Sequence, residues 1–130
     1  MTRLLLDTNA YSQAMRGKAT AMSLLRSADQ LLVCPVVLGE LLAGFRRGAR
    51  EQENREQLNR FLARPRVILM SIGADTAEFY SHVLSQLRRS GTPIPVNDIW
   101  IAACTMEHGA SLATRDRHFQ EVEGLLTISY

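Results

Sequence analysis

Four acidic side chains lie far apart in this chain, and each adjoins an apolar run: Asp7, Glu40, Asp98 and Asp116. A carboxylate beside buried surface is costly unless it is paired or binds a metal. Carboxylate oxygens are ligands that Mg²⁺ and Mn²⁺ prefer. Divalent cations held in this way can activate a water, neutralise phosphate charge and stabilise a leaving oxygen. The four residues therefore predict a site for a hard divalent cation that can hydrolyse a phosphodiester.

Each acid, taken alone, has a simpler explanation. Asp7 and Asp98 stand where a helix is expected to begin, and either could cap it. Asp116 lies between two arginines and could form an ordinary ion pair. Glu40 lies among apolar residues and could be a partly buried acid paired with an arginine. Four such placements in one small chain nevertheless favour a shared site.

Short apolar runs alternate with helical patterns along the chain, which predicts an α/β fold with a parallel sheet. The expected strands are Arg3–Leu6, Leu31–Cys34, Val67–Met70, Ser111–Thr114 and Leu126–Ser129. The expected helices are Ala10–Arg16, Ala19–Ala28, Val36–Gly44, Glu51–Ala63, Ala74–Arg89, Asp98–Glu107 and a short one over Asp116–Val122. Local signals support the boundaries: Pro35 suits a first helical turn, Asn97 or Asp98 a helix cap, and Gly109 a helix end.

This arrangement gives the acids a common location. In open α/β sheets, ligands bind beyond the carboxyl ends of the strands. Asp7 ends the first expected strand, Asp116 follows the fourth, and Asp98 opens a helix that can face the same edge. Glu40 can join them from one turn inside its own helix.

Composition restricts the class of protein. A chain of 130 residues with 46% hydrophobic and 22% charged residues is expected to form one soluble domain over residues 1–130. It has neither a membrane-spanning run nor a signal peptide, so a cytoplasmic protein without membrane contact is expected. Cys34 and Cys104 are isolated in apolar surroundings, which favours reduced core thiols. No phosphate-binding glycine loop and no GxSxG elbow is present.

Arginine dominates the basic residues. Only Lys18 among the 15 basic residues is a lysine. Arginine suits bidentate phosphate contacts, but a GC-rich genome would also favour its codons. Seven arginines against three glutamates lie between positions 46 and 66. This segment could face nucleic acid, or it could be a solvated helix surface with Arg–Glu pairs.

Several motifs together resemble the PIN-domain ribonucleases, and in particular the VapC toxins of toxin–antitoxin pairs. The first is Asp7-Thr8-Asn9 after an N-terminal strand, followed by Glu40 within a helix. The more specific ones are in the C-terminal part: Pro95-x-x-Asp98-x-x-Ile101-Ala102-Ala103, Thr114-x-Asp116 and His118-Phe119. The resemblance extends from Leu4 to Leu126.

The resemblance implies a three-layer α/β/α domain with a five-stranded parallel sheet. It also implies an endoribonuclease in which Asp7, Glu40, Asp98 and Asp116 are the catalytic and metal-binding quartet for Mg²⁺ or Mn²⁺. Asn9 and Thr114 match the polar positions that support these acids. We expect products with 5′-phosphate and 3′-hydroxyl ends, without use of the RNA 2′-hydroxyl. As candidates for guiding the RNA backbone we name Arg115, Arg117, Arg46 and Arg47.

The resemblance also implies partners. A VapC-like chain is expected to act on tRNA or ribosomal RNA, to form a homodimer, and to be neutralised by a VapB-like antitoxin. Promoter DNA would be bound only through the antitoxin complex. The alternatives are a PIN nuclease that processes RNA outside toxin–antitoxin biology, and a non-catalytic PIN scaffold that binds metal or nucleic acid.

Overall fold

The computed structural model describes every residue from Met1 to Tyr130. Its centre is a five-stranded sheet in the order β3-β2-β1-β4-β5, and all neighbouring strands are parallel. The strands are β1 (Arg3–Leu6), β2 (Gln30–Val33), β3 (Val67–Leu69), β4 (Ser111–Ala113) and β5 (Thr127–Ile128). The three central strands are almost wholly apolar, as expected for strands that are covered on both faces.

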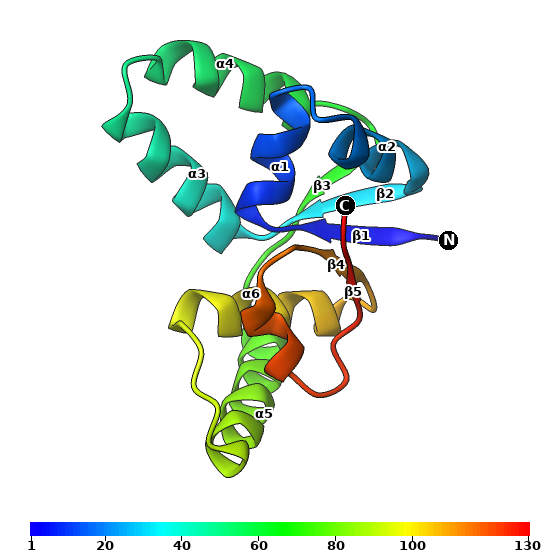
Figure 1. Cartoon of the computed structure of the whole chain (residues 1–130), viewed down its shortest axis with the longest axis vertical. Coiled ribbons are helices and arrows are strands. Elements are labelled where there is room, and N and C mark those ends of the chain that lie inside the picture. Colours follow the sequence, from blue (N-terminus) through cyan, green and yellow to red (C-terminus); the bar gives the residue numbers. More distant parts are fainter.

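Helices cover both faces of this sheet. Figure 1 shows α1 to α4 on one side and α5 and α6 on the other. Their bounds are α1 (Thr8–Met15), α2 (Ala19–Ser27), α3 (Pro35–Arg47), α4 (Glu51–Leu62), α5 (Ala74–Ser90) and α6 (Val96–Glu107), and a 3₁₀ helix η1 (Arg117–Glu121) follows β4. None of the helices is both long and apolar enough to span a lipid bilayer. The predicted α/β/α architecture with a five-stranded parallel sheet is therefore confirmed.

The strand order reverses direction between β1 and β4. From β1 the chain adds β2 and then β3 on one side, and it returns through α5 and α6 to place β4 on the other side of β1. The register pairs Leu4 with Ser111 and Leu6 with Ala113. A crevice beyond the carboxyl ends of two such strands is the usual ligand site of open parallel sheets. Asp7 and Thr114 are the first residues beyond these two ends.

Most boundaries agree with the sequence-based expectation to within one or two residues. Pro35 occupies the first turn of α3, and Gly109 adopts a left-handed φ of 59° just beyond α6. The expected cap of α6 was wrong, because Pro95 is the N-cap residue and Asn97 and Asp98 lie inside the first turn. The expected short helix after Asp116 is a 3₁₀ helix.

The core is a single cluster built on the leucines of β1 and β2 and on α6. Helix α6 is buried around most of its circumference, including Ile99, Ile101 and Cys104. Cys34 and Cys104 are both free and fully buried, as expected for reduced core thiols. A helix with so little exposed surface holds its first turn, and therefore Asp98, in a defined position relative to the sheet.

Candidate metal and nuclease site

A small cavity of about 120 Å³ lies at the reversal between β1 and β4. All four acids that the sequence singled out line it. The complete lining is Asp7, Thr8, Asn9, Glu40, Asp98, Ile101, Asp116 and Phe119. The cavity therefore draws its residues from the end of β1, from α1, α3 and α6, and from the segment after β4.

Asp7 forms the floor of this cavity and is 94% buried, with only 6% of its surface exposed. Its Oδ1 accepts the backbone N–H of Ala10 at 2.7 Å, which caps α1. Its Oδ2 accepts the hydroxyl of Thr114 at 2.5 Å. Burial raises the pKa of Asp7, the hydrogen bonds from Thr114 and Ala10 lower it, and the charges of Asp116 and Asp98 raise it. Burial is the largest of these effects, so an unneutralised carboxylate is disfavoured here.

Glu40 is held at the opposite wall by two polar neighbours. The hydroxyl of Thr8 donates to Glu40 Oε1 at 2.9 Å, and the side-chain amide of Asn97 lies 3.4 Å from Oε2. No arginine pairs with Glu40, so the alternative of a buried Arg–Glu pair is wrong. The acid is therefore oriented by neutral donors and has no cationic partner.

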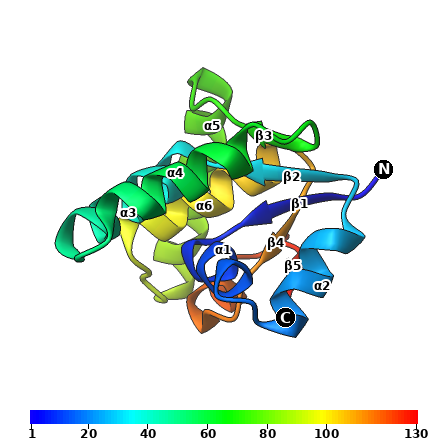
Figure 2. The same cartoon turned by 90° about the horizontal axis from the view of Figure 1, so that it is seen from above.

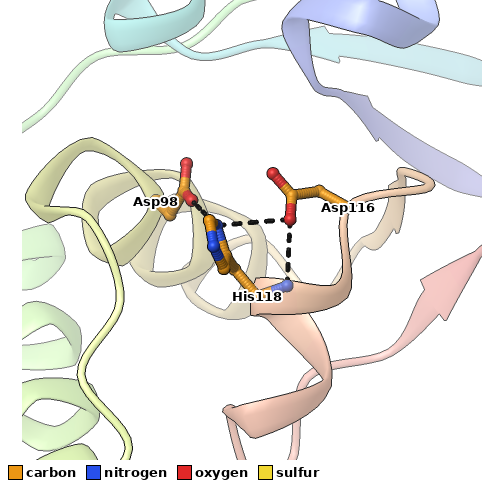
Figure 3. Close-up of side chains that lie close together, drawn as sticks. All are labelled: Asp98, Asp116 and His118. Carbon is orange, nitrogen blue, oxygen red and sulfur yellow. Dashed lines mark hydrogen bonds and ion pairs between the residues drawn. The ribbon is translucent and has the colours of Figure 1, made fainter.

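Asp98 and Asp116 form the third wall, and His118 lies beside them just outside the lining (Figure 3). His118 Nδ1 lies 3.1 Å from Asp98 Oδ2 and 3.2 Å from Asp116 Oδ1. The backbone N–H of His118 also donates to Asp116 Oδ1 at 2.9 Å, and the backbone N–H of Asp116 donates to Thr114 Oγ1 at 3.0 Å. Burial raises the pKa of Asp98, while the hydrogen bond from His118 lowers it. One ligand atom from each of the three residues lies within 4.8 Å of the other two.

The charge balance of the cavity fits a divalent cation. Four carboxylates line it, and no lysine or arginine forms an ion pair with any of them. His118, which contacts Asp98 and Asp116 from outside the lining, is half-exposed. Carboxylate oxygens in a small polar cavity match the ligand preference of Mg²⁺ and Mn²⁺. Asp7, Glu40, Asp98 and Asp116 are the residues that would hold such an ion.

The supporting and RNA-guiding residues proposed from the sequence have different positions. Thr114 contacts Asp7 directly, and Asn9 lines the cavity without a hydrogen bond to an acid. Arg115 turns away, because its Nε donates to the Tyr130 carbonyl and its guanidinium lies 4.6 Å from the Tyr130 ring centroid. Arg117 is exposed beside the cavity. Arg46 and Arg47 are exposed in the last turn of α3 and do not line the cavity.

Three contacts of the acids were not predicted from the sequence: those made by Thr8, Asn97 and His118. Each stands within two positions of an acid that was predicted, so adjacency is the signal that could have identified them. Asn97 was predicted only as a possible helix cap, and Thr8 only as part of the Asp7-Thr8-Asn9 motif. Their structural role is to reach across to Glu40 from α1 and α6.

The chain is therefore a parallel α/β protein with an acidic cavity at the point where the strand order reverses. Within this class, the chain belongs to the PIN domain family, whose family model matches residues 4–125.

Proteins of known function and structure support this assignment. The ribonuclease VapC4 of Mycobacterium tuberculosis is 29% identical over 87 residues, 67% of each chain. The ribonuclease VapC2 of Rickettsia felis is 26% identical over 127 residues, 94% of this chain and 93% of that protein. The fold is similar to the VapBC2 complex of Rickettsia felis bound to a promoter DNA fragment, with a TM-score of 0.87, 22% identity and 99% coverage of both chains.

Proposed function

We propose that this chain is a metal-dependent endoribonuclease and the toxin of a VapBC-type toxin–antitoxin pair. The observation that supports it most strongly is the convergence of four carboxylates without a lysine or arginine partner at the reversal of the sheet. RNA as the substrate is supported by the ribonuclease relatives, which align with most of this chain. The whole of residues 1–130 would act as one PIN domain, in the cytoplasm, where its substrate is found.

In this proposal each side chain at the cavity has a defined role. Asp7, Glu40, Asp98 and Asp116 would hold Mg²⁺ or Mn²⁺. The bound ion would supply an activated water, charge neutralisation at the phosphate and stabilisation of the leaving oxygen. Thr114 would fix the rotamer of Asp7, and Thr8 and Asn97 would fix Glu40. The products would have 5′-phosphate and 3′-hydroxyl ends.

His118 would hold Asp98 and Asp116 together when no metal is bound. Its ring lies between the two carboxylates, with Nδ1 3.1 Å from Asp98 Oδ2 and 3.2 Å from Asp116 Oδ1, and would hold both side chains in place. Its ring is half-exposed, so it would move away from the two acids when a metal ion binds. His118 is therefore a positioning residue for the two acids.

The proposal is tested by incubating the purified protein, free of antitoxin, with total cellular RNA in Mg²⁺ or Mn²⁺ and in EDTA. The matched variants are Asp98→Asn and Asp75→Asn. Both aspartates stand in the first turn of a helix, so both substitutions remove a similar interaction with the helix dipole. Discrete fragments are expected from the wild type and Asp75→Asn only when metal is present. Cleavage that survives EDTA or Asp98→Asn would contradict the carboxylate–metal mechanism.

The fragments from this experiment also identify the RNA. We expect tRNA or ribosomal RNA to be cut at one position, and mapping the fragment ends will identify it. A fragment that ends in a 2′,3′-cyclic phosphate would show that the RNA 2′-hydroxyl is the nucleophile, which contradicts the proposed chemistry.

The proposed partners are a VapB-like antitoxin and a second copy of the chain. The likeness to the VapBC2 complex bound to promoter DNA supports the antitoxin and DNA binding by its complex. Co-expression with its VapB-like antitoxin should yield a complex without ribonuclease activity that binds promoter DNA. The toxin alone should not bind that DNA, and light scattering should give the mass of a dimer. A monomer, or DNA binding by the toxin alone, would contradict this part of the proposal.

A further inference from the structure

A second concavity, with a volume of about 610 Å³, lies between α2 and the residues that follow β5. Figure 2 shows α2 next to the C-terminus. We call this open depression the α2 concavity. It shares no lining residue with the acidic cavity. The complete lining is Ala19, Thr20, Ser23, Leu24 and Ser27 of α2, with Ser129 and Tyr130 opposite them.

The α2 concavity reaches the same edge of the sheet as the acidic cavity. Strand β5 is parallel to β4, and the backbone N–H of Thr114 donates to the Ile128 carbonyl at 3.0 Å. Tyr130 therefore follows the carboxyl end of β5, two strand spacings or roughly 10 Å from Asp7 at the end of β1. Burial raises the pKa of Tyr130 to about 12, the charge of Asp7 adds to this increase, and Arg115 opposes it. A strand bound at the acidic cavity could thus reach the α2 concavity with its neighbouring nucleotides.

Arg115 is held at the rim of the α2 concavity. Its Nε donates to the Tyr130 carbonyl, and its guanidinium lies 4.6 Å from the centroid of the Tyr130 ring. The side chain is exposed, and its two terminal amino groups form neither a hydrogen bond nor an ion pair. A guanidinium held in one orientation with free N–H donors is well suited to a phosphate. Arg115 therefore turns away from the four acids but keeps a free cationic group beside them.

The lining of the α2 concavity has the chemistry that an unpaired nucleobase requires. No acidic residue contributes to it, whereas four line the neighbouring cavity. Most of its surface is hydrocarbon, and the exposed hydroxyls of Thr20, Ser23 and Ser129 form no hydrogen bond within the protein. Proteins bind single-stranded RNA by placing the flat face of a base on aromatic or apolar surface and by hydrogen bonding to its edge.

We propose that the α2 concavity binds an unpaired nucleotide of the substrate RNA, a few positions from the bond that is cut. The base would lie against Tyr130 and α2, the hydroxyls would bond to its edge or to the ribose 2′-hydroxyl, and Arg115 would contact its phosphate. This assignment rests on the proposed ribonuclease function. A helical protein segment fits less well, because a docked helix needs a row of apolar pockets, and only Ala19, Leu24 and Tyr130 are apolar here.

The phosphate contact is tested by RNA binding in an Asp98→Asn background, which is expected not to cleave. The two probes are a labelled oligoadenylate and a ribose-phosphate chain of the same length without bases, measured by fluorescence anisotropy as a function of salt. Arg115→Gln should weaken binding of both probes roughly three- to ten-fold and lower the salt slope by about 0.7. The control Arg89→Gln, exposed at the end of α5 on the opposite side of the sheet, should change neither value.

The base contact is tested by filling the α2 concavity. Ser23→Gln places a longer side chain in it from an exposed position, and Ser85→Gln is the matched change on exposed α5 surface. Ser23→Gln should weaken binding of oligoadenylate roughly ten-fold and leave the chain without bases unaffected. Equal affinity of the two variants for oligoadenylate would overturn the assignment.

Tyr130 provides an independent test of stacking. Tyr130→Leu should lower the affinity for oligoadenylate alone, whereas Tyr130→Phe keeps the ring and should bind like the wild type. Tyr130 also packs against the core, so the melting temperature of each variant is recorded. If Tyr130→Leu is folded and binds both probes like the wild type, the ring does not hold a base and the assignment fails.

Cleavage by the wild type distinguishes this inference from the proposed function. If the wild type cleaves RNA but Arg115→Gln and Ser23→Gln bind and cleave like their controls, the α2 assignment is wrong and the ribonuclease proposal stands. If these variants lose affinity for RNA but the wild type cuts no RNA, the α2 assignment stands and the ribonuclease proposal fails. Should they weaken binding of a polyglutamate peptide and leave RNA binding intact, the α2 concavity binds a protein segment and the assignment to RNA is overturned.

Discussion

The two carboxylate oxygens of Asp7 have different partners, which combines a structural and a site role in one residue. Oδ1 accepts the Ala10 N–H and caps α1, and Oδ2 accepts the Thr114 hydroxyl at the cavity floor. Capping and participation in a site were alternatives at the level of sequence, because each explains an aspartate after a strand. The structure shows that one rotamer satisfies both.

At the residue scale, Thr114 is predicted to lower the pKa of Asp7. Thr114→Val removes the hydroxyl that donates to Asp7 and accepts from the Asp116 N–H. Because that hydrogen bond lowers the pKa of Asp7, the acid limb of the cleavage-rate profile should move to higher pH. Stability should fall by about 1–2 kcal/mol, measured by urea unfolding. Thr114→Ser is the control, and a valine variant with the wild-type profile would rule out this tuning.

Asp7→Asn is predicted to stabilise the metal-free protein while it abolishes cleavage. The folded pKa of Asp7 lies above its ordinary value of 3.8, so the folded state binds more protons between these two values. The free energy of unfolding therefore falls as pH rises through this window, and the full penalty is present at neutral pH. Asparagine keeps an oxygen that can cap the helix but carries no charge. The free energy of unfolding in EDTA should therefore rise by about 1 kcal/mol, which corresponds to a few degrees in melting temperature. A lower melting temperature would show that the cap and the Thr114 hydrogen bond need the charge.

At the scale of elements, the strands were predicted to within about one residue, since apolar runs bounded by polar residues locate a buried parallel strand well. The start of α6 was predicted two residues late. Asn97 and Asp98 are residue types that usually cap helices, but here Pro95 is the N-cap residue and the helix begins at Val96. Their side chains instead contact Glu40 and His118, which are 57 and 20 positions away. Such long-range use of a cap-type residue is not visible in local sequence.

Helix α5 is predicted to hold the segment that contains His118 in place. Gln86 is 8% exposed; its amide donates to the Glu121 carbonyl, and its carbonyl accepts the Glu123 N–H, both at 3.0 Å. Gln86→Leu would leave two backbone groups without these partners. We expect a loss of about 1–3 kcal/mol in urea unfolding and a several-fold slower cleavage. Gln52→Leu, at an exposed position of α4, should change neither. Equal stability of the two variants would exclude this role for Gln86.

At the scale of the whole molecule, the sequence was sufficient to bring the four acids to one edge of one sheet. The argument needed only the alternation of strands and helices and the rule that ligands bind at carboxyl strand ends. It was not sufficient for the arginines, because a side chain's direction depends on its tertiary neighbours. Arg115, chosen for its proximity to Asp116, packs on Tyr130, while Arg16 and Arg60 meet in a groove from distant segments.

Metal binding is predicted to stabilise the fold in a pH-dependent way. An ion that binds only the folded state adds about 2.7 kcal/mol when its concentration is a hundred times its dissociation constant. Protons compete with the ion for the same carboxylates. Because the pKa values of Asp7 and Asp98 are raised, this competition extends to higher pH. The increase in melting temperature caused by Mg²⁺ or Mn²⁺ should therefore grow as pH rises from acidic to neutral. A pH-independent increase, or an equal one in Asp98→Asn, would locate the ion elsewhere.

The pairing of β1 with β4 also has a consequence for the newly made chain. Asp7 and Thr114 are 107 positions apart, so Asp7 must wait for a partner that is synthesised 107 residues later. While the ribosome still holds the C-terminal segment, β4 and Asp116 cannot join the sheet and the acidic cavity cannot form. Under the proposed function, a nascent chain would therefore lack its nuclease site until β4 and the segment after it have left the ribosome.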